Sequence, residues 1–265
     1  MPRTDFPPPR KSWGQHFLTA PAVAAAIVAA LPAVKGEQVL EIGPGRGALT
    51  NLLLTRGYRL TVVECDPKLV QYWRKQAGLE CLAGDILQLG PELFADRGPL
   101  HLISNLPYNI SSPLLALCSR HAASLLSLTI MLQHEFGARL LAPPGGKDYS
   151  ALSVVAQCVW RWEKIIAVGR GCFKPPPKVD SIVLRGLPVN PCPEPAVLKK
   201  LEQVARAVFS ARRKKLSNTL PHALGGDSER ARALLALTGT SPDLRPERVA
   251  PEIFLAWARS LVADR

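Results

Sequence analysis

Four consecutive residues, Asn105-Leu106-Pro107-Tyr108, have the types needed to prepare an aromatic amine for reaction. The lone pair of an exocyclic amine on a purine is delocalised into the ring, so its nitrogen is a poor nucleophile. Two acceptors, the Asn105 side-chain oxygen and the Leu106 carbonyl, can bind both N–H groups and favour a pyramidal nitrogen. Pro107 restricts the turn, and the flat face of Tyr108 can stack on the base. The alternative interpretation is an ordinary turn after a strand.

A glycine-rich segment, Glu41-Ile42-Gly43-Pro44-Gly45-Arg46-Gly47, lies between a predicted strand and a predicted helix. Glycines at such a place let backbone N–H groups approach a ligand at the start of a helix. A dinucleotide site favours G-x-G-x-x-G, whereas this segment has G-x-G-x-G preceded by an acid. The spacing therefore disfavours an NAD-dependent oxidoreductase, and the remaining alternative to a ligand site is a tight turn.

Two further acids, Glu64 and Asp85, follow predicted strands. A carboxylate at Glu64 can accept hydrogen bonds from both hydroxyls of a ribose, and Asp85 can accept one from an adenine amino group. This arrangement suits a nucleoside that carries a cation, and S-adenosylmethionine is such a ligand. Methyl transfer from a sulfonium to a neutral amine needs no strong base, so alignment must supply most of the catalysis. The alternative for Asp85 is a solvated acid, whereas Asp66 before Pro67 is predicted to cap a helix.

Strand-like and helical segments alternate along the first part of the chain. The predicted strands are 38–42, 60–64, 79–83, 100–104 and 128–132, and the predicted helices are 22–31, 48–56, 66–76, 113–119, 136–141 and 149–159. A closing strand pair is predicted at 162–168 and 181–185. This alternation predicts an α/β fold with a parallel sheet covered on both faces. The carboxyl ends of parallel strands meet at one edge, which is where ligands bind and where all the groups above should meet.

The pattern changes after residue 187. Prolines at 188, 191, 193 and 195 cannot continue a strand or a helix, so residues 188–195 are predicted to be a linker. Helical periodicity without a convincing strand follows, at 196–209, 212–220, 229–236 and 251–262. We therefore predict a flexible tail at 1–11, an α/β domain at 12–187, and a small all-helical domain at 196–265.

Composition supports a globular protein with an anionic partner. The 265 residues are 47% hydrophobic and carry a net charge of +12, which excludes a disordered chain and favours RNA, DNA or an anionic lipid as partner. Six cysteines are spaced singly, so reduced thiols are predicted rather than disulfides or a metal site. The Ala-rich segment 22–31 is too short to span a bilayer, so a cytoplasmic protein without a membrane partner is predicted.

The motifs occur in the order and spacing of the rRNA adenine N6-dimethyltransferases, and the sequence most resembles the KsgA-type enzymes of the small ribosomal subunit. The resemblance covers residues 11–260 and is carried by 15–18, 41–47, Glu64, 84–85, 105–108, 131–135, 149–154, 173–181 and 209–220. It implies a Rossmann-like class I methyltransferase fold with a mostly parallel sheet and a helical C-terminal domain. It also implies dimethylation, from S-adenosylmethionine, of two adjacent adenosines in the 3′-terminal hairpin of 16S rRNA, in the 30S subunit or its precursor.

The resemblance further implies roles for individual residues. The cofactor would be held by His16 and Leu18 at its methionine end, Gly43 and Gly45 in the loop, Glu64 at its ribose, Asp85 at its adenine, and Asn105 near the transferred methyl. Phe173 would stack on the target base opposite Tyr108, unless it packs its segment against the core. Departures from the common family pattern occur at His16, Arg46 and His134.

The target base must be extruded or already unpaired to reach such a site. Arg212, Arg213, Lys214 and Lys215 place four positive charges in just over one predicted helical turn, and Lys174 and Lys178 flank the Pro-rich segment. We expect phosphate contacts from these residues, the alternative being a solvated surface. The rival functions are a macrolide-resistance type 23S rRNA methylase and a non-catalytic ribosome-assembly factor. Nothing in the sequence demands a dimer, so a monomer is expected.

Overall fold

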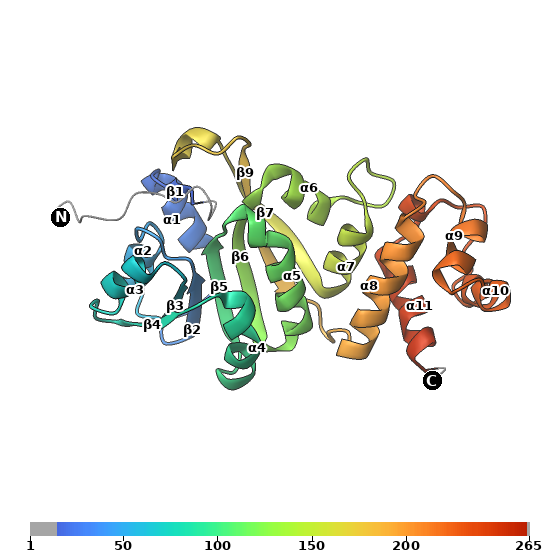
Figure 1. The fold of residues 1–265 in the computed structure, drawn as a ribbon, viewed down its shortest axis with the longest axis horizontal. Helices are drawn as coiled ribbons and strands as arrows, with labels where there is room; N and C mark the ends of the chain where they lie inside the picture. The colour runs from blue at the N-terminus through green and yellow to red at the C-terminus, as the bar shows by residue number, and fades with distance from the viewer. Residues whose placement is uncertain (1–14, 264–265) are drawn as a thin grey trace. The chain divides into compact units, whose positions relative to one another are not determined.

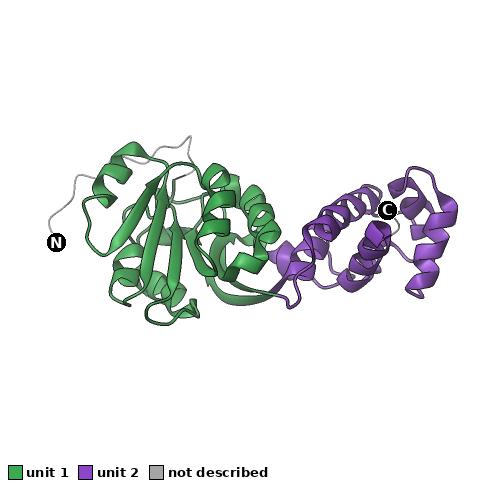
Figure 2. Ribbon diagram, turned by 90° about the horizontal axis from the view of Figure 1, so that it is seen from below, with its two compact units in different colours: residues 1–137, 162–188 green, residues 138–161, 189–265 purple. Residues whose placement is uncertain are grey.

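A computed structural model describes residues 15–263 of the chain, so the predicted tail at 1–11 lies outside the described residues. The chain divides into two compact units (Figure 2). The first contains residues 15–137 and 162–188, and the second contains residues 138–161 and 189–263. No helix within 15–263 is both long and apolar enough to cross a membrane. The six cysteines are all free.

The first unit is built around a seven-stranded sheet with the order β4-β3-β2-β5-β6-β9-β7 (Figure 1). Its strands are β2 (Gln38–Ile42), β3 (Arg59–Glu64), β4 (Leu79–Ala83), β5 (Leu100–Asn105), β6 (Leu125–Gln133), β7 (Trp160–Val168) and β9 (Ser181–Pro188). The neighbours from β4 to β6 are parallel, whereas β9 is antiparallel to β6. The predicted, mostly parallel sheet is confirmed. The strand order reverses between β2 and β5, and such a reversal opens a crevice at the carboxyl ends of the strands.

Helices cover both faces of this sheet. Helices α1 (Pro21–Ala30), α2 (Thr50–Leu54) and α3 (Pro67–Trp73) share one hydrophobic core with the strands. Helices α4 (Ile86–Asp96) and α5 (Ser111–Arg120) pack against each other and lie in front of the sheet in Figure 1. Helix α4 was not predicted, and its Gly90-Pro91 pair disfavours a helix. The helix forms because Asp85 caps its start and its apolar residues, including Phe94, are buried.

A second, smaller sheet was not predicted. Strand β1 (Phe17–Leu18) pairs antiparallel with β8 (Phe173–Lys174), so that Leu18 lies opposite Phe173. The Thr19 N–H extends this contact by donating to the Cys172 carbonyl (2.8 Å). Two segments that are far apart in the sequence are thereby joined, and this pairing decides where both aromatic residues, Phe17 and Phe173, are placed.

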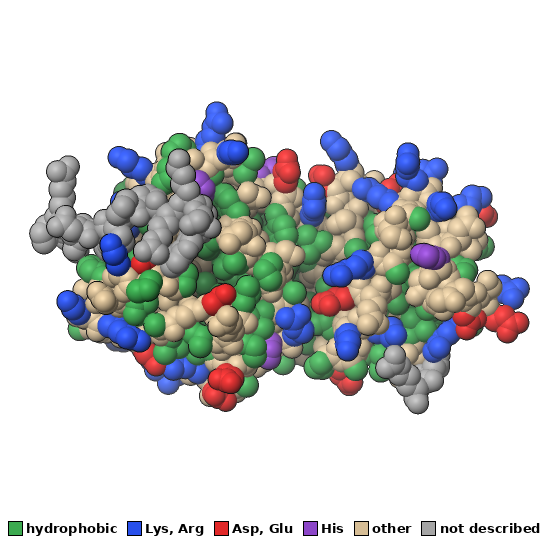
Figure 3. Space-filling model, in the orientation of Figure 1, with side chains coloured by type: hydrophobic (Ala, Val, Ile, Leu, Met, Phe, Trp, Pro, Cys, Tyr) green, Lys and Arg blue, Asp and Glu red, His purple; other side chains and the backbone are tan. Residues whose placement is uncertain are grey.

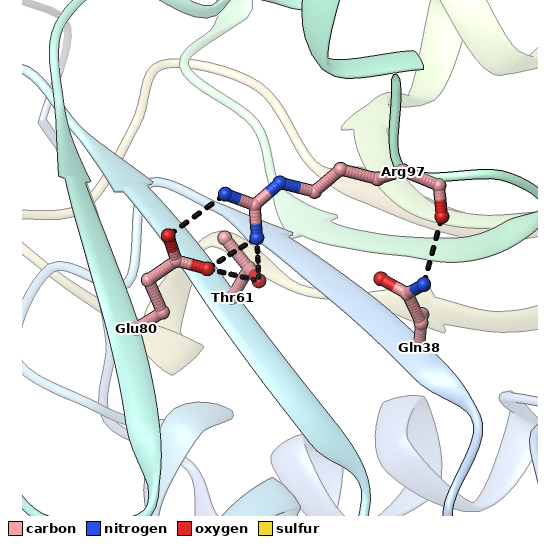
Figure 4. A network of polar contacts seen from close by, with 4 residues as sticks. All are labelled: Gln38, Thr61, Glu80 and Arg97. Atoms are coloured by element: carbon pink, nitrogen blue, oxygen red, sulfur yellow. Dashed lines mark hydrogen bonds and ion pairs between the residues drawn. The ribbon is translucent and has the colours of Figure 1, made fainter. Parts of the chain in front are cut away.

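The edge of the large sheet is held by a polar network (Figure 4). The Arg97 guanidinium forms an ion pair with Glu80 on β4 and donates to the Thr61 hydroxyl on β3 (3.4 Å). The Arg97 carbonyl accepts from the Gln38 side chain on β2 (2.7 Å). The segment after α4 is thus tied to three neighbouring strands. Because the pair is partly exposed, its stabilising effect is modest, about 1 kcal/mol or less.

The second unit is helical. It contains α7 (Ala151–Val159), α8 (Pro195–Phe209), α9 (Leu216–Ala223), α10 (Ser228–Leu237) and α11 (Pro251–Ala263), whereas α6 (His134–Leu141) crosses from the first unit. The structure differs here from the predicted division at residue 187, because α7 packs against α8 and α11. The contact follows from the buried face of α7, and from the Tyr149 hydroxyl, which donates to the Val249 carbonyl (2.8 Å).

Candidate active site

A cavity of about 340 Å³ lies at the carboxyl ends of β2, β3, β4 and β5. Its volume is typical of sites that enclose small molecules. The predicted site residues that line it are His16, Leu18, Gly43, Gly45, Glu64, Asp85, Asn105, Leu106, Pro107 and Tyr108. The structure therefore brings together the glycine loop, the two acids and the Asn-Leu-Pro-Tyr segment, as expected from the common edge of parallel strands.

The three glycines of the loop have positive φ angles and meet different requirements. A Cβ at Gly43 would meet no atom within 4 Å, so this backbone is open to a ligand. A Cβ at Gly45 would lie 3.0 Å from the Phe17 ring, and one at Gly47 would lie 2.7 Å from Trp73. The Trp73 ring N–H also donates to the Gly45 carbonyl (3.0 Å). Gly45 and Gly47 thus permit close packing of the loop, whereas Gly43 leaves room for a ligand.

Backbone donors fix the orientation of the Glu64 carboxylate. Its Oε1 accepts from the N–H groups of Cys65 and Asp66 (2.9 Å each), and its Oε2 accepts from the Gly45 N–H (3.3 Å). Burial raises the pKa of Glu64, and these hydrogen bonds oppose the rise. Asp66 caps α3 through the Lys68 N–H (2.9 Å), which confirms the predicted cap. A carboxylate held this firmly is a suitable acceptor for a sugar hydroxyl.

Asp85 serves the fold as well as lining the cavity. One of its oxygens, Oδ1, accepts from the Leu87 N–H at the start of α4 (2.9 Å). This cap fixes the side chain at the mouth of the cavity and leaves the second oxygen for another donor. The predicted alternatives for Asp85 were a ligand contact or a solvated acid, and the helix cap is an additional role.

Glu41, the acid that precedes the glycine loop, was expected to be one of the acceptors around it but was given no site role of its own. Glu41 lines the cavity, only 1% of it is exposed, and its Oε2 has no hydrogen-bond partner among the described residues. Burial, reinforced by the charge of Glu64, raises its pKa to about 8, although hydrogen bonds with Thr50 oppose the rise. A buried acceptor without a partner beside the open Gly43 fits a ligand that carries a cation. Its position two residues before Gly43 is the signal in the sequence that points to this role.

The Asn-Leu-Pro-Tyr segment follows β5 and is held by residues distant in sequence. The Asn105 Nδ2 donates to the His16 carbonyl (3.2 Å), which leaves its Oδ1 as the atom available to accept. Pro107 precedes a short 3-10 helix, Tyr108–Ile110. The Tyr108 hydroxyl lies 2.7 Å from the Ser181 Oγ, and burial raises the pKa of Tyr108. The ring is therefore a neutral stacking surface.

His16, the residue before β1, contacts the Asn-Leu-Pro-Tyr segment and also the carbonyl of Pro175. Its ring stacks on Tyr108, with centroids 5.8 Å apart and planes inclined by 27°. Its Nδ1 lies 2.8 Å from the Pro175 carbonyl, and since a carbonyl can only accept, the proton resides on Nδ1.

The comparison with known proteins agrees with this geometry. The family model described as ribosomal RNA adenine dimethylase matches residues 8–237. The chain belongs to this family. The predicted enzyme class, an S-adenosylmethionine-dependent rRNA adenine dimethylase, is thereby confirmed. The protein named ribosomal RNA small subunit methyltransferase A from Pseudomonas aeruginosa is 40% identical over 258 residues, covering 95% of this chain and 94% of the relative. The protein of the same name from Nitratidesulfovibrio vulgaris is 41% identical over 267 residues, covering 96% of this chain and 97% of that relative.

Two solved structures share the fold of this dimethylase. A dimethyladenosine transferase from Plasmodium falciparum has a TM-score of 0.75 and 24% identity, covering 94% of this chain and 98% of that chain. The 23S rRNA methyltransferase ErmE has a TM-score of 0.69 and 28% identity, covering 93% and 99%. These matches confirm the predicted Rossmann-like sheet with a helical C-terminal part.

The structure buries Phe173, the residue expected to stack on the target base unless it packs its segment against the core. Phe173 does not line the cavity; only 4% of it is exposed, and it belongs to the hydrophobic core of the first unit. Its pairing with Leu18 across β1 and β8 turns the ring inward. Of the two interpretations that the sequence left open, packing against the core is the one that this geometry supports.

Replacing Phe173 by alanine is therefore expected to destabilise the protein. Removing a buried aromatic ring costs about 3–5 kcal/mol of unfolding free energy. Urea denaturation measures this loss, and methyl transfer at low temperature, where the variant is folded, should remain close to normal. A variant of normal stability with strongly reduced transfer would contradict the assignment to the core and restore the stacking role.

The basic segment 212–215 is not helical, in contrast to the prediction. It forms the turn between α8 and α9, and two of its residues are held by distant groups. The Arg212 guanidinium pairs with Glu247 (2.6 Å) and donates to the carbonyls of Gly146 and Lys147 (3.1 and 2.9 Å). Lys215 pairs with Asp243 (2.8 Å). Arg212 thus has a structural role in the second unit.

The other predicted RNA contacts are exposed. Arg213 and Lys214 lie in the same turn, and Lys174 and Lys178 lie in the first unit, all with exposed side chains. Lys and Arg side chains are spread over the face drawn in Figure 3. His134, one of the departures from the family pattern, begins α6, and Arg46, another, lies over the Phe17 ring (4.6 Å from its centroid).

Proposed function

We propose that this dimethylase methylates N6 of two adjacent adenosines in the 3′-terminal hairpin of 16S rRNA, within the 30S subunit or its precursor. The observation that carries the proposal is the single cavity shared by the glycine loop, Glu64, Asp85 and the segment 105–108. The small-subunit assignment is supported by curated relatives of that name at 40% and 41% identity over nearly the whole chain, against 28% for the 23S enzyme. A role in 30S biogenesis, a monomer and a cytoplasmic location belong to the same proposal.

The cavity residues fit S-adenosylmethionine, and S-adenosylhomocysteine as its product. Bound there, this cofactor supplies a methyl group attached to a positively charged sulfur. We assign its methionine end to His16 and Leu18, its ribose to Glu64 and its adenine to Asp85. The open backbone at Gly43, and the buried Glu41 oxygen without a described partner, supply an approach and an acceptor for its cationic part. Gly45 shapes the loop through its contact with Phe17.

The segment 105–108 prepares the target nitrogen. The Asn105 Oδ1 and the Leu106 carbonyl accept its two N–H groups, and Tyr108 stacks on the base. The nitrogen is then fixed and its lone pair is directed into the cavity, so most of the acceleration comes from alignment, for which about 7–11 kcal/mol is attainable. No base is needed, because the product ammonium loses its proton to water. Among residues 15–263, no group of acids, histidines and cysteines is arranged to hold a metal ion.

Arg213, Lys214, Lys174 and Lys178 are proposed to contact phosphates, which position the RNA without selecting its sequence. Replacing both Arg213 and Lys214 by alanine should weaken RNA binding and reduce the slope of log K against log salt by about 1.5, because two contacts release fewer counterions. Cofactor affinity should be unchanged. Filter binding at several salt concentrations measures the slope, with Lys199→Ala/Lys200→Ala as the matched loss of two charges. An unaltered slope in the Arg213/Lys214 variant would reject the contact.

Arg212→Ala is expected to behave differently. It should lower the unfolding free energy by about 1–3 kcal/mol, because the hydrogen bonds to Gly146, Lys147 and Glu247 are lost. The salt slope measured on folded protein should stay close to that of the wild type. A fall in the slope without a change in stability would return Arg212 to the RNA-binding residues.

The function itself is tested by incubating the protein with labelled S-adenosylmethionine and 30S particles that lack the modification, followed by mapping of the label. We expect two adjacent adenosines near the 3′ end of 16S rRNA to be labelled. Label confined to 50S particles would favour the 23S activity. Binding to the particle without any label would favour a non-catalytic assembly factor.

A further inference from the structure

The Tyr108 ring is held at two points although it lines the cavity. Its hydroxyl lies 2.7 Å from the Ser181 Oγ, and one face stacks on His16. A tyrosine on a short 3-10 helix would otherwise move between rotamers, and each rotamer presents a different surface to a base. Both restraints come from outside the segment that contains Tyr108.

Ser181 is well placed to act as such a restraint. It is the first residue of β9, it pairs with Gln133 on β6, and none of it is exposed. The preceding residue, Asp180, is fixed by its own contacts: its carbonyl accepts from the His134 N–H and its carboxylate from the Arg170 N–H (2.9 Å each). A hydroxyl buried in this way is costly to leave without a partner, so its bond to Tyr108 is strongly favoured.

We propose that Ser181 is a positioning residue for the target adenine: it holds the Tyr108 ring so that the stacking face is in place before the base enters. This inference rests on the proposed function of the segment 105–108. The expected gain in methylation rate comes from preorganisation, because a ring that is already fixed loses little conformational freedom when the base stacks on it. Ser181 itself need not touch the base or the cofactor.

A double-mutant cycle on Ser181 and Tyr108 tests the inference. Ser181→Ala and Tyr108→Phe remove the same hydrogen bond from opposite ends, so each should lower the single-turnover methylation rate of the target adenosine about tenfold. If Ser181 acts through the Tyr108 hydroxyl, the double variant should be no slower than either single variant. Cofactor affinity, measured by calorimetry, should be unchanged in all three variants.

The chain offers a matched control in Ser127. It is equally buried, lies on β6, and its hydroxyl is 2.8 Å from the His101 Nδ1, so Ser127→Ala also removes a buried bond between a serine and a ring. We expect this variant to lose stability without a change in the methylation rate of folded protein. Thermal melting of all variants separates stability from rate. If Ser181→Ala does not fold, Tyr108→Phe still removes the bond, and its rate decides the question.

A second readout follows the base itself. In a hairpin RNA with 2-aminopurine at the target position, stacking on Tyr108 quenches the fluorescence, and Ser181→Ala should reduce this quenching. Two outcomes would overturn this inference while leaving the proposed function intact, provided the wild type methylates the particle. One is a double variant whose rate loss is the product of the two single losses; the other is a normal methylation rate and normal quenching in Ser181→Ala. A wild type that does not methylate small-subunit RNA would overturn the proposed function and this inference with it.

Discussion

Replacing Asn105 by alanine is expected to lower the rate of methyl transfer by about a hundred- to a thousandfold, the loss typical of removing one fixed group that stabilises the transition state. The amide is oriented by its donation to the His16 carbonyl, so its Oδ1 is the atom that accepts from the target amine. Without that oxygen the nitrogen keeps its delocalised lone pair. The variant should fold normally, because the side chain is only partly buried.

Single-turnover assays measure the rate, and calorimetry with the cofactor measures affinity, which we expect to be largely retained. Asn109→Ala is the matched control, since Asn109 has the same side chain, lies four positions later and lines the same cavity. Near-normal turnover in Asn105→Ala would disprove the proposed preparation of the amine. Loss of cofactor affinity equal to the loss of rate would instead assign Asn105 to cofactor binding alone.

Replacing Glu41 by glutamine is expected to stabilise the protein, and increasingly so as the pH rises. Burial raises the pKa of Glu41 to about 8 from 4.5, so the folded protein keeps a proton that the unfolded chain releases. Between these values the folded state therefore loses stability with rising pH, by about 1.4 kcal/mol per pH unit. Glutamine keeps the shape and carries no charge, so it removes this loss.

Urea denaturation at pH 5, 6, 7 and 8 gives the difference between variant and wild type. We expect this difference to be small at pH 5 and to reach about 3–5 kcal/mol at pH 8. Glu92→Gln, at an exposed acid on α4, is the control and should show no such trend. A difference that stays constant across this range would show that Glu41 is ionised in the folded protein throughout.

Local rules were sufficient to place most of the site. Asp66 followed by Pro67 defines a helix start, and the predicted strands 38–42 and 79–83 coincide with β2 and β4. Because the carboxyl ends of parallel strands share one edge, Gly43, Glu64 and Asp85 could be brought together without knowing how the chain folds in detail. These predictions needed only residue type and spacing, since caps, turns and strand alternation depend on near neighbours.

Other features depended on partners far along the chain. Phe173 points into the core because β8 pairs with β1, and Arg212, although its side chain is partly exposed, is engaged by Glu247 and the carbonyls of Gly146 and Lys147. A hydrophobic ring or a cation has the same type in either setting, so its sequence position alone cannot distinguish core from surface. The sequence by itself determined the chemistry at the sheet edge. Tertiary structure decided which of the remaining aromatic and basic side chains are exposed and which are buried or paired. Burial and pairing depend on contacts between distant segments, which residue type and spacing do not specify.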